Sequence, residues 1–161
     1  MRDENCIFCK LANGDIPTTT LYEDDTFRVI FDASPATVGH VLIIPKEHYE
    51  DLTKLPDEVA AQVMPLARRI GIAEMEALGA KGFNVVQNNG EAAGQTVHHF
   101  HTHVIPRYGT EDEMVLWKPG TTDAAELADT CEKLQAALNN ERLGHVAVPS
   151  GGLARMPGPL R

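Results

Sequence analysis

The sequence predicts an α+β fold in which one long helix packs on an antiparallel, five-stranded sheet. Three observations support this: five short segments rich in β-branched or apolar residues, longer segments with helical spacing, and an order of strands, helix, strands, helix along the chain. The 161 residues suffice for one domain with its own core. We expect that domain to cover residues 1–143, including a C-terminal helix, and to be followed by a Gly/Pro-rich tail over residues 144–161.

The expected strands are marked by residue type and by turn-forming residues at their ends. The acidic turn Glu23-Asp24-Asp25 lies within the first part, which forms either one strand or a hairpin of two. The apolar run 41–44 is typical of a central strand covered on both faces. Pro45 and Pro106 are expected to end the third and fifth strands. The five segments are 16–22, 26–31, 39–45, 83–87 and 96–105.

Helical spacing of apolar residues occurs over three segments. In the longest, two acidic residues occupy the first turn, Pro65 should kink the axis, and Gly79 is a natural stop. In the last, Asp123 is a candidate N-cap, and an apolar stripe predicts a face that packs against the protein, with Cys131 as a buried thiol. The segments are 6–14, 57–78 and 123–139, and the stripe consists of Leu127, Cys131, Leu134 and Leu138.

Composition and charge argue against several classes of protein. The formal net charge of -9 disfavours a protein that binds nucleic acid through a basic face. A small phosphate-bearing ligand is still compatible, because one local pocket of imidazole and backbone N–H groups can hold it. No stretch has the apolar length of a signal peptide core or a membrane span, so we expect a cytoplasmic protein without a membrane partner. Three cysteines, an odd number, argue against a disulfide framework.

The most informative segment is His98-His99-Phe100-His101-Thr102-His103. On a strand, residues two apart share a face, so His99, His101 and His103 would project together. Grouped imidazoles can bind a metal, accept protons or attack phosphorus. A histidine-rich surface tract is the alternative, but the segment continues with apolar Val104-Ile105 and its flanks are not low-complexity.

The loop before the histidines has the composition of an anion-binding site. Asn88-Asn89-Gly90 and Gly94-Gln95-Thr96 contain glycines that let the backbone turn N–H groups toward an anion, and they add neutral side-chain donors. Neutral donors together with imidazoles suit a phosphate that must be held and then released. The chain contains no GxxxxGK[ST] loop, which excludes ATP hydrolysis of the P-loop type, and no GxSxG elbow.

The run from His99 to Ile105 resembles the signature of the histidine-triad family, His-φ-His-φ-His-φ-φ with φ apolar, apart from the polar Thr102. Segments 31–35, 39–46 and 88–107 also resemble family segments in the family's order, and the resemblance covers about residues 6–109. It implies nucleotidyl hydrolysis or transfer at the α-phosphate of a purine nucleotide conjugate. The implied enzyme is a nucleoside phosphoramidase or a dinucleoside polyphosphate hydrolase, and the implied assembly is a homodimer.

The resemblance also implies roles for individual residues. His101 would attack phosphorus and form a nucleotidyl-histidine intermediate, which water then hydrolyses. His103 would donate a hydrogen bond to a non-bridging phosphate oxygen. Thr96 or Gln95 would assist the leaving group, and Asn88 would bind phosphate.

At the nucleoside end, Asp32 would accept hydrogen bonds from the ribose hydroxyls. The residues expected to line the base pocket are Phe8, Leu11, Ile16 and Ile30. For these apolar residues ordinary core packing is an equal alternative, and Asp32 has the alternative of a turn residue before Ser34-Pro35. His40 follows Gly39 at a strand start and is either a half-buried structural histidine or a residue near the site.

A second group of candidate residues concerns metal. Cys6-Ile7-Phe8-Cys9 is a CxxC motif, which alone supplies two of the four ligands of a tetrahedral zinc site. Many bacterial members of the resembled family complete such a site with the histidine of a Pro-x-x-His segment and the first triad histidine, here His48 and His99. The resemblance therefore implies a closed, structural Zn²⁺ site. Free thiols that pack as small hydrophobes are the alternative.

Two other functions compete with the enzyme. A zinc-stabilised nucleotide-binding or scaffold module with little turnover is the first. A uridylyltransferase relative is the second, disfavoured because that branch resembles a two-histidine motif. Within the enzymes, Gly94-Gln95-Thr96-Val97 fits the phosphoramidase-like and the polyphosphate-like branches alike. The region from Trp117 onward either extends toward a partner subunit's pocket or covers the sheet.

Overall fold

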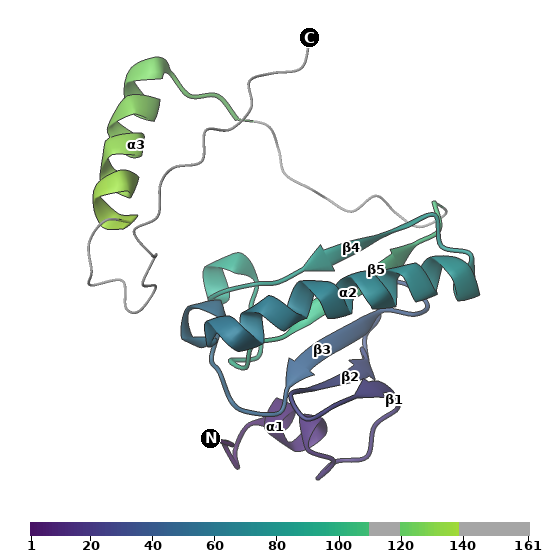
Figure 1. Cartoon of the computed structure of the whole chain (residues 1–161). Coiled ribbons are helices and arrows are strands. Elements are labelled where there is room, and N and C mark those ends of the chain that lie inside the picture. Colours follow the sequence, from purple (N-terminus) through teal and green to yellow (C-terminus); the bar gives the residue numbers. More distant parts are fainter. Residues whose placement is uncertain (110–119, 139–161) are drawn as a thin grey trace. The chain divides into compact units, whose positions relative to one another are not determined.

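The structure, a computed structural model, describes residues 1–109 and 120–138. These residues belong to two units, and each unit is described by itself (Figure 1). Among the helices in these ranges, none is both long enough and apolar enough to cross a bilayer. Trp117 and the expected tail over 144–161 lie outside the described residues, and the domain boundary at residue 143 stays a prediction.

The first unit is built on a five-stranded antiparallel sheet with the strand order β1-β2-β3-β5-β4. The sheet, with helices packed on it, confirms the predicted α+β architecture, and β1 and β2 form the expected hairpin. Strand β3 is buried at every position, as expected for a central strand covered on both faces. The strands are β1 (Thr20–Glu23), β2 (Phe27–Phe31), β3 (Val41–Pro45), β4 (Gly82–Val86) and β5 (Thr102–Arg107).

Of the two prolines expected to end strands, Pro45 is the last residue of β3, as predicted, whereas Pro106 lies inside β5, which continues to Arg107. Pro45 pairs with Phe27 in β2, and Pro106 pairs with Phe83 in β4. The pairing between β3 and β5 extends no further than Ile43 in β3 and Val104 in β5, so each proline has a neighbouring strand on one side alone. The missing proline N–H is therefore tolerated at these positions.

The histidine strand is shorter than predicted. It begins at Thr102 and not near residue 96, so of the three triad histidines His103 alone lies in β5. The preceding residues are held by loop contacts: the His99 N–H donates to the carbonyl of Val97 at 2.8 Å, and the Phe100 N–H donates to that of Tyr49 at 2.6 Å. Strand alternation therefore does not by itself orient His99 and His101.

Helices α1 (Ile7–Ala12) and α2 (Asp57–Leu78) cover opposite faces of the sheet. Val41 and Ile43 belong to the core beneath α2, whereas Leu42 and Ile44 belong to the core beneath α1. Figure 1 shows α2 running roughly along the direction of β4 and β5, the strands that it contacts. The helix runs continuously through Pro65 and ends, as predicted, at Gly79 in the left-handed conformation. Two short 3₁₀ helices, Leu52–Lys54 and Glu91–Ala93, complete the unit.

The second unit contains helix α3 (Ala124–Leu138). The predicted cap is present, since the Glu126 N–H donates to the Asp123 carboxylate at 2.9 Å. The expectation that Cys131 is a buried core thiol is wrong, because Cys131 is exposed, as are Leu127, Leu134 and Leu138. An apolar stripe predicts burial only where another surface covers it, and the described residues of this unit provide none.

Candidate active site

A cavity of about 390 Å³ lies in the first unit, on the α1 side of the sheet. Its walls come from α1, from β2 and β3, from the loop after β4 and from the triad segment. Its lining includes both apolar and polar side chains. The predicted site residues that line it are Phe8, Leu11, Ile30, Asp32, Asn88, Thr96, His101 and His103.

Two predicted residues do not line this cavity: Ile16 and Gln95. The side chain of Gln95 is 3% exposed and its polar atoms are engaged within the protein. Its Nε2 donates to the carbonyls of Glu50 and Val97 at 2.7 and 3.0 Å, and its Oε1 accepts from the Gly90 N–H at 2.7 Å. These bonds hold the loop that carries Thr96, so Gln95 supports the cavity wall although its own side chain does not line the cavity.

His101 is buried and lines the cavity, and one of its ring nitrogens faces a backbone carbonyl. Its Nδ1 lies 2.6 Å from the carbonyl oxygen of His99. A carbonyl can only accept, so Nδ1 carries the proton and Nε2 carries the lone pair. Burial lowers the pKa of His101 below its usual 6.5, which keeps the ring neutral at pH 7. His101 therefore has the protonation state of a nucleophile, with Nε2 as the attacking atom.

His103 is oriented by His40, a residue whose position near the site the sequence left open. The Ala36 N–H lies 3.0 Å from His40 Nδ1, and His40 Nε2 lies 2.9 Å from His103 Nδ1. A backbone N–H can only donate, so the His40 proton is on Nε2 and is donated to His103 Nδ1. The remaining proton of neutral His103 is then on Nε2, ready to donate to a phosphate oxygen.

Both rings of this pair are neutral at pH 7. Burial lowers the pKa of His40, and burial together with the neighbouring His101 and His40 lowers the pKa of His103 to about 4. Oδ2 of Asp32 lies 3.6 Å from His40 Nε2 and 3.7 Å from His103 Nδ1. Its Oδ1 accepts from the Ser34 N–H at 2.7 Å, so Asp32 is the turn residue that the sequence offered as one alternative, and it also lines the cavity.

Asp32, His40 and His103 also have ligand atoms close enough to hold a metal ion. The hydrogen bonds argue against one. A metal would need the lone pair of His40 Nε2, which would leave a proton on Nδ1 facing the Ala36 N–H at 3.0 Å. Two donors would then oppose each other, so we interpret this group as a hydrogen-bonded one.

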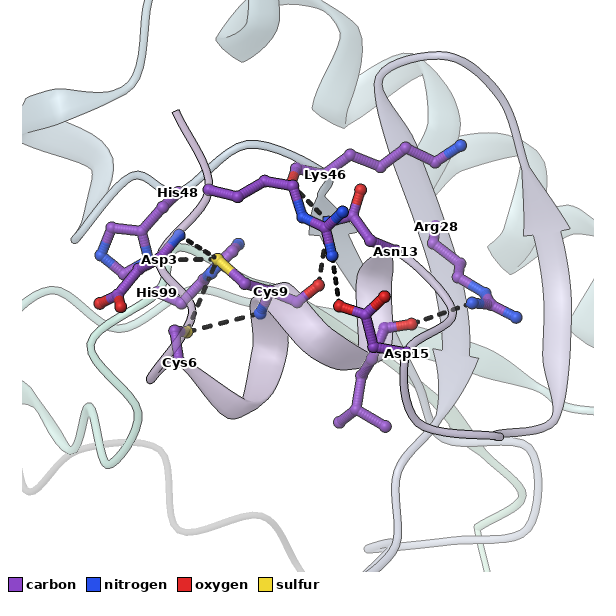
Figure 2. A network of polar contacts seen from close by, with 11 residues as sticks. Asp3, Cys6, Cys9, Asn13, Asp15, Arg28, Lys46, His48 and His99 are labelled. Carbon is purple, nitrogen blue, oxygen red and sulfur yellow. Dashed lines mark hydrogen bonds and ion pairs between the residues drawn. The ribbon is translucent and has the colours of Figure 1, made fainter.

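The four predicted metal ligands come together beside the cavity (Figure 2). The Nδ1 atom of His99 lies 3.3 Å from Cys6 Sγ and 3.5 Å from Cys9 Sγ, and Cys9 Sγ lies 3.5 Å from His48 Nδ1. Around a tetrahedral zinc ion with typical bond lengths, a sulfur and a nitrogen are about 3.6 Å apart. These spacings fit that ion.

The hydrogen bond on the other ring nitrogen of His99 also fits a bound zinc ion. His99 is fully buried, and its Nε2 lies 3.0 Å from the carbonyl oxygen of Pro45, which places the proton on Nε2 and the lone pair on Nδ1, toward the sulfurs. Burial and the nearby His48 and His101 lower the pKa of His99 to about 4, so the ring is neutral, as a metal ligand must be.

The comparisons with known proteins show the family of this chain. The HIT domain family model matches residues 13–110. Protein hit of Bacillus subtilis is 44% identical over 121 residues, which are 74% of this chain and 83% of that protein. Adenosine 5'-monophosphoramidase hnt1 of Schizosaccharomyces pombe is 41% identical over 107 residues, 66% of this chain and 77% of that one. The crystal structure of a Zn-bound histidine triad family protein from Mycobacterium smegmatis has a TM-score of 0.66 at 39% identity and covers 83% of this chain and 97% of that chain.

The chain therefore belongs to the HIT domain family, as the histidine motif indicated.

Proposed function

We propose that this protein hydrolyses nucleoside 5'-phosphoramidates through a nucleotidyl-histidine intermediate on His101. The observation that carries the proposal is the bond from His101 Nδ1 to the His99 carbonyl at 2.6 Å, which leaves Nε2 as the free nucleophilic nitrogen of a cavity-lining ring. The similarity to a relative named adenosine 5'-monophosphoramidase supports the phosphorus–nitrogen bond as the one cleaved.

The cavity suggests how such a substrate binds. The base would pack against the apolar side chains of Phe8, Leu11 and Ile30, and the ribose hydroxyls would donate to the Asp32 carboxylate. The α-phosphate would then lie between Asn88 and the imidazoles of His101 and His103. Because the apolar wall offers little hydrogen bonding to a base, we expect binding energy there to come from burial of the ring system.

In the reaction, His101 Nε2 attacks phosphorus and the phosphorus–nitrogen bond breaks. The departing nitrogen keeps the bonding electrons and receives a proton that the hydroxyl of Thr96 relays from solvent, while His103 Nε2–H donates to a non-bridging oxygen. Water then attacks phosphorus and gives up a proton to solvent, the bond to His101 Nε2 breaks with its electrons returning to the ring, and nucleoside monophosphate leaves the regenerated neutral imidazole. A hydroxyl, two imidazoles and an amide, without lysine or arginine in the lining, suit release of the product.

The test of this proposal is the variant His101→Ala, with His98→Ala as the matched control, because His98 is exposed and does not line the cavity. We expect His101→Ala to lose release of AMP from adenosine 5'-phosphoramidate and His98→Ala to keep it. Protein incubated with a substrate labelled at the α-phosphorus and quenched in alkaline denaturant should carry label on His101, because a phosphorus–nitrogen bond to histidine survives alkali but not acid. Nucleotide binding without turnover or label would instead establish the binding module, and faster cleavage of dinucleoside polyphosphates would assign the other enzyme branch.

We further propose that Cys6, Cys9, His48 and His99 hold a structural Zn²⁺ ion. All four positions are filled by protein ligands, which leaves no open position for substrate, so the ion would serve as a cross-link between segments distant in sequence. Elemental analysis of purified protein should find one zinc ion per chain. The double variant Cys6→Ser/Cys9→Ser should contain none.

We also propose a homodimer in a reducing compartment such as the cytoplasm. Strand β4 lies at one edge of the sheet, and α2 exposes Met64, Ile72 and Met75, so an unpaired edge and apolar side chains are available to a second copy. The free thiols of Cys6 and Cys9 must stay reduced to bind metal. Light scattering on the full chain would report twice the 17.6 kDa protomer mass if this is correct.

A further inference from the structure

Helix α1 forms part of both sites. Cys6, its N-cap residue, and Cys9 face the metal cluster, while Phe8 and Leu11 line the nucleotide cavity. A helix of six residues is too short to be stable alone, so its position depends on what it packs against and what it binds. An ion bound by the two cysteines would therefore fix the apolar wall of the cavity.

The triad segment makes a second link between the two sites. The ring of His99 faces the metal cluster through Nδ1, and its own carbonyl oxygen accepts from His101 Nδ1 at 2.6 Å. Phe8 packs edge-on against both imidazoles, with ring centroids 6.2 Å from His99 and 4.9 Å from His101. Any shift of His99 toward or away from the sulfurs therefore moves the atom that sets the tautomer of the nucleophile.

We propose that metal binding and nucleotide binding are thermodynamically coupled through α1 and His99, with His99 as the positioning residue for His101. The inference rests on the proposed function, which names the two ligands. Zinc orders the cavity wall and the His99 carbonyl before nucleotide arrives, and bound nucleotide in turn holds Phe8 and the cysteines in place for zinc. Linkage requires both effects to have the same size, and couplings between sites are commonly about 5- to 150-fold.

The first experiment measures the dissociation constant of AMP by calorimetry, with the full chain loaded with zinc and after chelation. Circular dichroism checks that the chelated protein is still folded. We expect AMP to bind the stripped protein at least about fivefold more weakly. Competition with a chromophoric chelator should show zinc binding more tightly in saturating AMP, by the same factor.

A second readout does not depend on the stripped protein staying folded. Cobalt replaces zinc in the full chain, and its visible absorption reports the geometry of the four ligands. AMP should shift that spectrum, although none of its atoms is expected to touch the metal.

Two variants separate the coupling from simple loss of affinity. Asp32→Asn removes a ribose contact that lies away from the metal ligands, and it should weaken AMP binding while the coupling factor is retained. Phe8→Leu removes the ring that contacts both His99 and His101, and it should reduce the coupling factor.

Equal AMP affinity with and without zinc, together with an unchanged cobalt spectrum, would overturn the coupling. If His101 is nevertheless labelled by substrate in that case, the proposed function stands and the coupling alone fails. If AMP binds neither form, both are wrong.

Discussion

Glu74 carries a buried carboxyl whose charge the fold does not compensate. It lies on the inner face of α2, its side chain is 5% exposed, and both carboxyl oxygens lack a hydrogen-bond partner among the described residues. Burial raises the pKa of Glu74 from 4.5 to about 7. Between these two values the unfolded chain has released the proton and the folded chain retains it, so folding stability falls as pH rises.

The size of the effect follows from the two pKa values. Each unit of pKa difference corresponds to about 1.4 kcal/mol, so the shift from 4.5 to about 7 costs the folded state about 3 kcal/mol once the pH is well above 7. About 1 kcal/mol of this should appear between pH 6.5 and 8.5. Near pH 6.5 the histidines act in the opposite direction, because the unfolded chain still protonates His40 and His103 in part, whereas their lowered pKa values keep them neutral in the folded chain. This contribution is the same in the parent and in a Glu74 variant, so it cancels from the difference between them.

The variant Glu74→Gln removes the ionisation but keeps the size and polarity of the protonated side chain. We expect it to be more stable than the parent by about 3 kcal/mol at pH 8.5 and close to it at pH 4. Urea unfolding of the zinc-loaded full chain across this pH range measures the difference. Glu76→Gln is the matched control, because Glu76 is exposed on the same helix. A constant difference between Glu74→Gln and the parent at every pH would refute the reasoning.

Three further predictions test other parts of the structure. Thr102→Val should stabilise the protein by about 1 kcal/mol in urea unfolding, because the buried Thr102 hydroxyl has no hydrogen-bond partner within residues 1–109 and 120–138, whereas Thr102→Ala should destabilise it by loss of packing. His40→Phe should lower kcat for phosphoramidate hydrolysis by about 10²-fold with His103 still present, and an unchanged kcat would remove His40 from the mechanism. Chelation should lower the midpoint of thermal unfolding, and an identical midpoint would contradict a structural metal.

The fold was largely predictable because its elements have local signatures. The β-branched and aromatic content of residues 26–31, the apolar run 41–44 and the spacing over 57–78 are each local features of a segment. The boundaries of β5 were less predictable. Whether a proline or a histidine belongs to a strand depends on how far the neighbouring strand extends beside it, and that neighbour is distant in sequence.

The candidate site also has features that follow from the sequence and features that depend on the tertiary structure. Residue type and spacing alone mark His99, His101, His103 and the CxxC motif as candidates for chemistry. The antiparallel register that sets Leu42 opposite His103 brings His40 within 2.9 Å of that imidazole, and packing committed the Gln95 amide to the loop backbone. Likewise, the exposure of Cys131 depends on which surface lies over its helix. Hydrogen-bond direction, and with it the proton on each ring, arises from groups that meet in space, so it is decided by tertiary contacts and not by spacing along the chain.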